Sequence, residues 1–253
     1  MIVKIDHIAL TSDNFAKDIK VFKSLGYNEK FVKKGVPNLE IKKDILNVFS
    51  ETHDLALFVS EDNINIELLD HGNIAQGEHY LLPVFNAVPD NDAEFLGTLN
   101  VGPYVFTQIN SCVFDTPVYV KEDPAVVFKF RDMVVRVRDV DESSKFWQCL
   151  GFMQVEEGNG FARLEFRSRL EKATFGLYLQ RCAEVKKKHF LDDAGFNCIA
   201  FVTSSIKNEK QMLEYKGFVT TEIEELMVDD KLLDIFFTKG PSGELVEIIG
   251  VGQ

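Results

Sequence analysis

The sequence lacks the features that mark several classes of protein. None of its apolar runs approaches the length of a membrane-spanning helix, so no transmembrane segment is expected. Positive charge is in deficit: the formal net charge of −12 opposes nucleic-acid binding, because an acidic surface repels phosphates. No signal peptide is recognisable, since Met1 to Val3 lead directly into an apolar segment, and we expect a cytoplasmic protein.

Cysteines are few and widely spaced. The chain has four, with none of the close spacings that indicate zinc sites or disulfide frameworks. Two of them, Cys149 and Cys198, lie in helical or aliphatic stretches, where a reduced thiol behaves as a small apolar side chain. We therefore expect the cysteines to be reduced.

A repeated segment organises the 253 residues, which are enough for two domains of ordinary size. Ile5 to Tyr27 begins as a short apolar strand. It continues as an amphipathic helix with Phe15, Ile19 and Phe22 on one face, and Gly26 ends the helix.

Two further copies of this opening follow. Residues 130–152 and 196–218 each show an apolar strand, a capped helix and a glycine exit, at Gly151 and Gly217. Every opening is followed by alternating segments that are suitable for strands. The repeating unit is therefore βαβββ, and a fixed order of elements that occurs three times indicates a chain built from modules.

The first unit contains IDHIAL, the LGY exit and INIELLDH, and GPSGELVEIIG stands near the end of the chain. With these motifs the units resemble those of the vicinal oxygen chelate superfamily, which includes glyoxalase I, extradiol dioxygenases and bleomycin resistance proteins, and GPSGELVEIIG is similar to the end of a last module in that superfamily. The resemblance implies an α+β fold of tandem βαβββ modules that pair into curved mixed sheets in two domains.

We expect the domains to be residues 1–127 and 128–253. The second would contain modules 128–182 and 195–253, which we call units three and four, paired with each other because a single unit leaves one sheet face open. The first would contain the opening module, unit one, and a degenerate second module, unit two.

Residues 71–127 match the repeat poorly. Gly102 to Phe106 resembles the start of a second module, and Ala93 to Leu99 has the composition of a short helix. The alternative is an extension packed against the first module. A charged stretch at residues 33–53 is longer than a hairpin needs, and it is compatible with a strand pair that carries an excursion or with a lid.

The resemblance also implies a metal site. In this superfamily the ligands project from the first and last strands of each module, and the metal lies between modules. These positions fall on His7 and Glu67, an imidazole and a carboxylate suited to Zn²⁺, Ni²⁺, Mn²⁺ or Fe²⁺. Glu67 would also move a substrate proton. The alternative is a core histidine and an exposed carboxylate.

The corresponding positions in units three and four carry different chemistry. Asp132 and Cys198 precede their helices by the same number of residues as His7 precedes its own helix. The last strands of these units supply Tyr178 and Glu247. The curved sheet of units three and four would enclose a carboxy-terminal cup, and without a histidine this cup is expected to be structural or to bind a ligand. We take Asp132, Tyr178 and Glu247 as its substrate-binding residues, with Asp132 in a surface salt bridge as the alternative.

Unit two offers Tyr104 at its expected first-strand position, and we count it as substrate-binding. A phenol there argues against an extradiol dioxygenase, which needs a second imidazole. His53, His71 and His79 could each supply a further ligand, or could lie at the surface.

Three functions remain open. The first is a lyase, isomerase or epimerase that uses one divalent metal on a small oxygenated metabolite. The second is a metal-free protein that binds a small molecule, and the third is a catalytically inactive interaction protein. A homodimer is compatible with each, whereas nucleic acid and membranes are not expected as partners.

Overall fold

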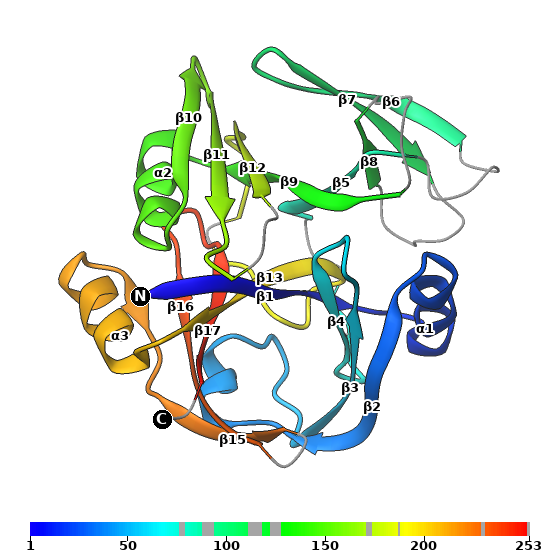
Figure 1. Cartoon of the computed structure of the whole chain (residues 1–253), viewed down its shortest axis with the longest axis vertical. Coiled ribbons are helices and arrows are strands. Elements are labelled where there is room, and N and C mark those ends of the chain that lie inside the picture. The colour runs from blue at the N-terminus through cyan, green and yellow to red at the C-terminus, as the bar shows by residue number, and fades with distance from the viewer. Residues whose placement is uncertain are drawn as a thin grey trace.

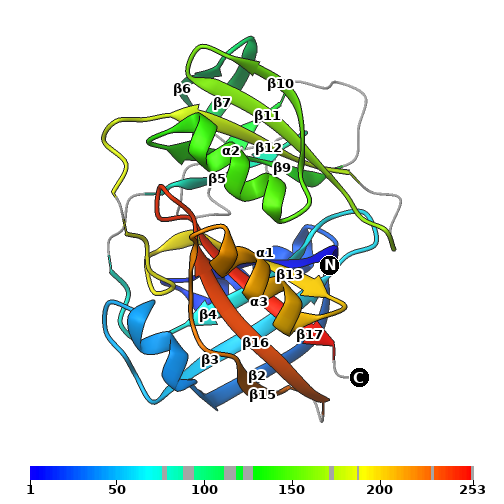
Figure 2. The ribbon, with the colours of Figure 1, turned by 90° about the vertical axis from the view of Figure 1, so that its left-hand side faces the viewer.

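The computed structural model describes residues 1–75, 79–87, 94–110, 118–121, 128–170, 174–186, 188–228 and 231–251. In these ranges the chain forms two curved sheets, stacked on one another, with helices at their sides (Figures 1 and 2). No helix of the described part is long and apolar enough to cross a membrane.

The three predicted helices are present. They are α1 (Phe15–Ser24), α2 (Val140–Cys149) and α3 (Ile206–Tyr215). The side chains of Asn14 and Asp139 accept hydrogen bonds from backbone N–H groups in the first turns of α1 and α2, as expected of N-caps. Behind the helices, Gly26, Gly151 and Gly217 have φ of 84°, 96° and 87°, a left-handed conformation that favours glycine.

The first sheet joins unit one to unit four. Its order is β14–β16–β17–β13–β1–β4–β3–β2, with β15 paired to β16. At its centre β1 and β13 run antiparallel. The strands are β1 (Ile2–Thr11), β2 (Asn28–Pro37), β3 (Thr52–Val59), β4 (Asn65–Asp70), β13 (Gly195–Thr203), β14 (Val219–Thr220), β15 (Glu224–Val228), β16 (Lys231–Lys239) and β17 (Leu245–Val251).

The second sheet joins unit three to the intervening unit two. Its order is β10–β11–β12–β9–β5–β8–β7–β6, with β9 and β5 antiparallel at the centre. The strands are β5 (Leu81–Phe85), β6 (Glu94–Val101), β7 (Tyr104–Asn110), β8 (Val118–Val120), β9 (Phe130–Val137), β10 (Met153–Gly158), β11 (Phe161–Arg167) and β12 (Thr174–Arg181).

This pairing corrects the predicted organisation. We expected units three and four to share a sheet and a boundary between residues 127 and 128. Instead, unit four pairs with unit one, and unit three pairs with unit two. The first strands of all units are apolar, and each exposes unpaired backbone groups at an edge. Their composition therefore indicates that first strands pair with one another, but it does not indicate which two units are joined.

Unit two also differs from its prediction. Residues 94–101 form the strand β6 rather than a helix, and Gly102 lies in the turn between β6 and β7. The first strand of unit two is β5, so Tyr104 does not hold the first-strand position. β-branched and aromatic residues along β6 and β7 pair across the hairpin, which outweighs the weak local helix preference.

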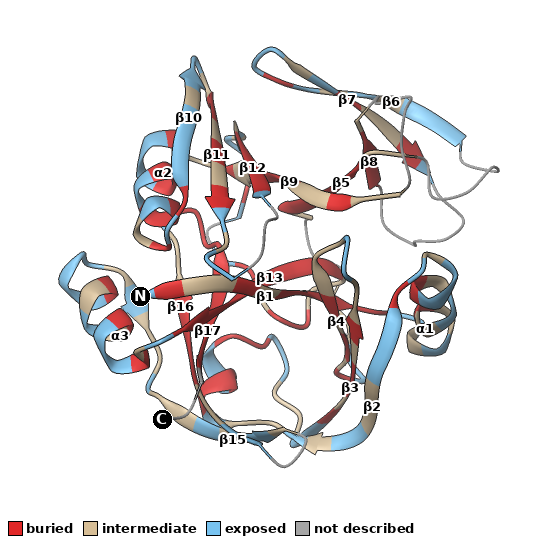
Figure 3. Ribbon diagram, viewed as in Figure 1, coloured by how far each residue is buried: buried red, intermediate tan, exposed pale blue. Residues whose placement is uncertain are grey.

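Three apolar clusters hold these layers together. The largest lies between the two sheets and under the helices, and it includes Phe22, Trp147 and Phe201. A second cluster lines the concave face of the first sheet, and a third lines that of the second sheet. Burial is densest along the central strands of both sheets (Figure 3). Each sheet is therefore a cup whose concave face is separate from the core between the sheets.

Candidate metal centre

Three ionisable side chains converge in the first cup, which is the concave face of the first sheet. Nε2 of His7 lies 3.3 Å from Oε2 of Glu67 and 3.5 Å from Oε2 of Glu247. In the described part of the chain these residues form a group of potential metal ligands whose atoms all lie within 4.8 Å of one another.

Strand register brings the three together. His7 on β1 lies opposite Ala200 on β13, which in turn lies opposite Glu247 on β17. On the other side, Glu67 on β4 lies opposite Ala9 of β1. Because alanines stand between the long side chains, the imidazole and both carboxylates can reach the same point above the sheet.

The electrostatics of the group are tightly coupled. His7 is 5% exposed, and Nε2 has no hydrogen-bond partner. Burial alone lowers the pKa of His7, but Glu67, Asp6 and Glu247 raise it well above its usual value. Burial raises the pKa of Glu67, but His7 and Lys42 lower it overall. The ionised carboxylate of Glu67 and the side chain of Glu247 therefore face an imidazole nitrogen that a divalent cation can bind in place of a proton.

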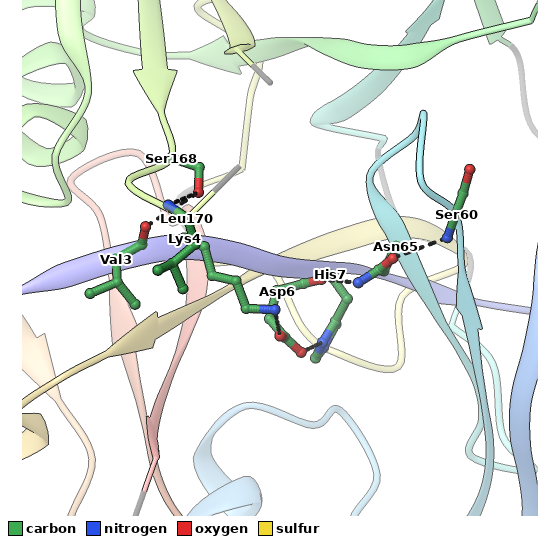
Figure 4. Close-up of polar contacts among 8 residues, drawn as sticks. All are labelled: Val3, Lys4, Asp6, His7, Ser60, Asn65, Ser168 and Leu170. Carbon is green, nitrogen blue, oxygen red and sulfur yellow. Dashed lines mark hydrogen bonds and ion pairs between the residues drawn. The ribbon is translucent and has the colours of Figure 1, made fainter. Parts of the chain in front are cut away.

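A carboxylate also supports the opposite side of the imidazole. Oδ2 of Asp6 lies 3.2 Å from Nδ1 of His7, and Oδ1 lies 2.7 Å from Nζ of Lys4 (Figure 4). Burial raises the pKa of Asp6, but His7 and Lys4 bring it far below its usual range. This contact directs Nε2 of His7 toward Glu67 and Glu247.

A β-bulge makes the contact between neighbouring residues possible. Along β1 the register shifts between Ile5, opposite Phe201, and His7, opposite Ala200, so Asp6 is an extra residue on this strand. In a regular strand, adjacent side chains point to opposite faces, and a bulge redirects one of them. Nothing in the alternation of the sequence predicted this role for Asp6.

Two more histidines line the same cup. The surface position that the sequence suggested for His53 and His71 is wrong, because the two residues are 5% and 3% exposed and their rings are stacked 5.3 Å apart. Burial and then Lys42 lower the pKa of His53 to about 3 and that of His71 to about 4, so both are neutral. His79 is half-buried.

The excursion between β2 and β3 covers the cup. It carries the 3₁₀ helix η1 (Glu40–Asp44) and lies inside the curve of the first sheet, as Figure 1 shows in blue. Ile41, Ile45 and Leu46 join the apolar cluster there. Asp192 holds the segment in place by accepting hydrogen bonds from the backbone N–H groups of Asn47, at 2.7 Å, and Val48, at 3.0 Å.

The structure redistributes the predicted ligand residues. His7 and Glu67 meet, as the resemblance implied. Glu247 lies with these two residues, whereas we expected it to lie with Asp132 and Tyr178. Cys198 also belongs to the first cup, where it is buried in the apolar cluster. This is a consequence of the pairing between units one and four.

The remaining predicted residues lie together in the second cup, the concave face of the second sheet. The rings of Tyr104 and Tyr178 are 4.9 Å apart. The charge of Lys121 acts on Asp132, and its Nζ donates to the hydroxyl of Tyr178. Lys121 was not among the predicted site residues, because a single lysine at a strand end carries no motif.

Comparison with known proteins establishes the fold. No family model and no curated protein match the sequence. A Bacillus subtilis protein provisionally named a dioxygenase matches all of this chain and 86% of its own, with a TM-score of 0.63 and 11% identity. Glyoxalase I from Zea mays matches 98% of this chain and 92% of its own, with a TM-score of 0.62 and 14% identity. The chain therefore has a glyoxalase-like fold.

Proposed function

We propose that the chain is a divalent-metal-dependent lyase, isomerase or epimerase that acts on a small oxygenated metabolite in the first cup. The observation that carries this proposal is the convergence of His7, Glu67 and Glu247 from three strands. The likeness in fold to glyoxalase I supports the same class of chemistry.

The donor set fits a metal ion. Ligands bound to zinc at about 2.0 to 2.2 Å in a tetrahedron lie roughly 3.4 Å from each other. The distances of 3.3 and 3.5 Å from His7 to the two carboxylates agree with this spacing. One imidazole and two carboxylates differ from the two-histidine face of non-haem iron oxygenases, which favours proton transfer over oxygen chemistry.

The residues of the first cup have different roles in the proposed reaction. When bound, the cation supplies Lewis-acid polarisation of a substrate oxygen. His7, Glu67 and Glu247 would hold that cation, Asp6 would orient His7, and Glu67 would also move the proton at the carbon next to the polarised oxygen. The excursion that carries η1 excludes water above the site, which strengthens these electrostatic interactions.

A second candidate, a metal-free binding protein of the same fold, has one specific observation in its favour. Ile41, Ile45 and Leu46 occupy part of the first cup, so the chain itself contributes apolar surface where a substrate would lie. In that case the imidazole and carboxylates form a buried ion cluster with a structural role.

Metal content tests the proposal. Untagged protein should contain about one divalent ion per chain by mass spectrometry, from Zn²⁺, Ni²⁺, Mn²⁺ or Fe²⁺. Glu67→Gln and Glu247→Gln should each lose most of it, because an amide is neutral and binds these ions weakly. The control Glu222→Gln changes a side chain with 87% exposure and should keep the metal.

Activity is tested separately. Small α-hydroxy and α-oxo carbonyl compounds are incubated in D₂O, and deuterium exchange next to the carbonyl is followed by NMR. Exchange in the wild type that Glu67→Gln abolishes is the expected result. If the protein binds no metal after incubation with each of the four ions, the enzyme proposal is wrong and the binding protein takes its place.

A further inference from the structure

The register of the second sheet reveals which of its residues correspond to the candidate metal ligands. In the first cup, Glu67 lies opposite Ala9, two residues after His7. In the second cup, Tyr178 lies opposite Val134, two residues after Asp132. Asp132 and Tyr178 therefore occupy the places of His7 and Glu67.

The same rule identifies the other two positions. Val84 on β5 lies opposite both Asp132 on β9 and Tyr119 on β8. Leu82, two residues before Val84, therefore corresponds to Cys198 in the first cup, and Tyr119 corresponds to Glu247. The four positions hold one carboxylate, two phenols and a leucine, which is not a donor set for a transition metal.

An ammonium group lies beside the residues that correspond to the ligands of the first cup. Nζ of Lys121 donates to the hydroxyl of Tyr178 at 3.3 Å, and its positive charge acts on Asp132. Burial lowers the pKa of Lys121, but Asp132 and Tyr178 raise it overall, so the amine stays charged. The second cup thus carries a cation of its own next to its last-strand position.

A second cation approaches the same aromatic ring. The guanidinium of Arg163 lies 5.7 Å from the ring centroids of both Tyr104 and Tyr178, and Nζ of Lys121 lies 5.8 Å from that of Tyr178. Arg163 also pairs with Glu165 at 2.7 Å, but its Nε is buried without a hydrogen-bond partner.

The base of the cup is aromatic and closely fitted. Tyr178 is fully buried and packs edge-on against Phe106 and Tyr104. Beside it, a Cβ at Gly176 would lie 2.2 Å from Oδ1 of Asp132, so the glycine makes room for this carboxylate. Tyr104, Lys121, Asp132 and Arg163 are all half-buried, so part of each residue reaches solvent.

We propose that the second cup is a metal-independent binding site for a small aromatic carboxylate. Lys121 and Arg163 bind the carboxylate group, Tyr104 contacts the ring and is supported from behind by the buried Tyr178, and Asp132 accepts a hydrogen bond from a hydroxyl or amine substituent. The two positively charged side chains attract the carboxylate of the ligand, and the aromatic side chains favour contact with its planar ring.

Isothermal titration of chelator-treated protein with 4-hydroxybenzoate tests the site without any contribution from the first cup. We expect saturable binding of one molecule per chain, with 4-hydroxybenzyl alcohol and acetate much weaker. Lys121→Met should weaken binding about tenfold or more, because a charge-assisted hydrogen bond is lost. Lys121→Arg should retain most of the affinity, and Lys207→Met, on the exposed face of α3, should leave it unchanged.

Three outcomes overturn the proposal. They are absence of saturable binding to the wild type, equal affinity in Lys121→Met with an unchanged melting temperature, and a second equivalent of metal that Asp132→Asn removes. If Lys121→Met does not fold, equal affinity in Tyr104→Leu decides against the site. Each result leaves the metal content of the first cup, and hence the proposed enzyme, untouched.

Discussion

A single extra residue in β1 prepares the candidate metal centre. The bulge at Asp6 brings its carboxylate to Nδ1 of His7, so the other ring nitrogen faces Glu67 and Glu247. Carboxylates in this outer position fix the orientation of a ligating histidine and raise its basicity. The irregular backbone at Asp6 thus has a chemical consequence, which is the orientation of the His7 ring.

Asp6→Asn should weaken metal binding without removing it. The amide keeps the shape but loses the charge that supports His7, so we expect a decrease in affinity of about 10- to 100-fold. Competition with a metallochromic indicator measures the change, with the exposed Asp13→Asn as the matched control. Equal affinities in Asp6→Asn and the wild type would show that Asp6 has no positioning role.

The neutral histidines of the first cup should make the protein sensitive to acid. Their pKa values, about 3 for His53 and about 4 for His71, lie below the value near 6.5 of an unfolded chain. At pH values between the pKa of the folded protein and that of the unfolded chain, the unfolded state binds more protons than the folded state. The free energy of unfolding therefore falls as pH falls below 6.5, by about 1.4 kcal/mol per pH unit for each histidine.

Denaturant unfolding between pH 6.5 and pH 5 checks this contribution. The double variant His53→Gln, His71→Gln should show a shallower pH dependence than the wild type. His189→Gln is the matched control, because burial also lowers the pKa of this one histidine to about 4, and it should remove about half as much of the slope. A double variant as acid-sensitive as the wild type contradicts the assignment.

Among the elements, the excursion with η1 decides access to the first cup. Its attachment depends on Asp192, which is 1% exposed and accepts from two backbone N–H groups and from Nδ2 of Asn47. Deletion of a buried charged acceptor leaves these donors unpaired. The segment is therefore held by a few identifiable bonds.

Asp192→Ala should release this segment. We expect a loss of local stability on the order of 2 kcal/mol or more, seen as faster hydrogen exchange at residues 45–48. Asp193→Ala is the control, because Asp193 reaches the segment only through the side chain of Asn47. Unchanged exchange in Asp192→Ala would mean that the apolar contacts of Ile41 and Ile45 suffice.

At the scale of the whole molecule, each cup is completed by strands from both halves of the chain. Neither cup needs a second copy, so a homodimer stays a prediction that the fold does not require. The two halves are nevertheless interdependent, because β1 needs β13 and β9 needs β5.

Fragments 1–127 and 128–253 test this dependence. Each exposes a central first strand, and we expect neither to show a cooperative thermal transition by circular dichroism when expressed alone. Their mixture should recover one, together with the metal content of the intact chain. Cooperative unfolding of residues 128–253 alone would support the pairing of units three and four that the structure replaces.

The sequence alone determined the repeating unit and one half of the candidate centre. Helix spacing, N-caps and glycine exits are local features, so α1, α2 and α3 were predictable, as was the placement of His7 and Glu67 within one module. The first strands of all modules are similarly apolar, so the pattern could not say which copies pair.

Only the tertiary structure decided the composition of each cup. Pairing of β1 with β13 brought Glu247 to His7, and pairing of β9 with β5 left Asp132 with Lys121. The bulge at Asp6 likewise depends on the register between strands about 190 residues apart in the chain. Local alternation of apolar residues decides which face of a strand is buried, but no turn joins these distant strands, so the contacts of the assembled sheet decide their register.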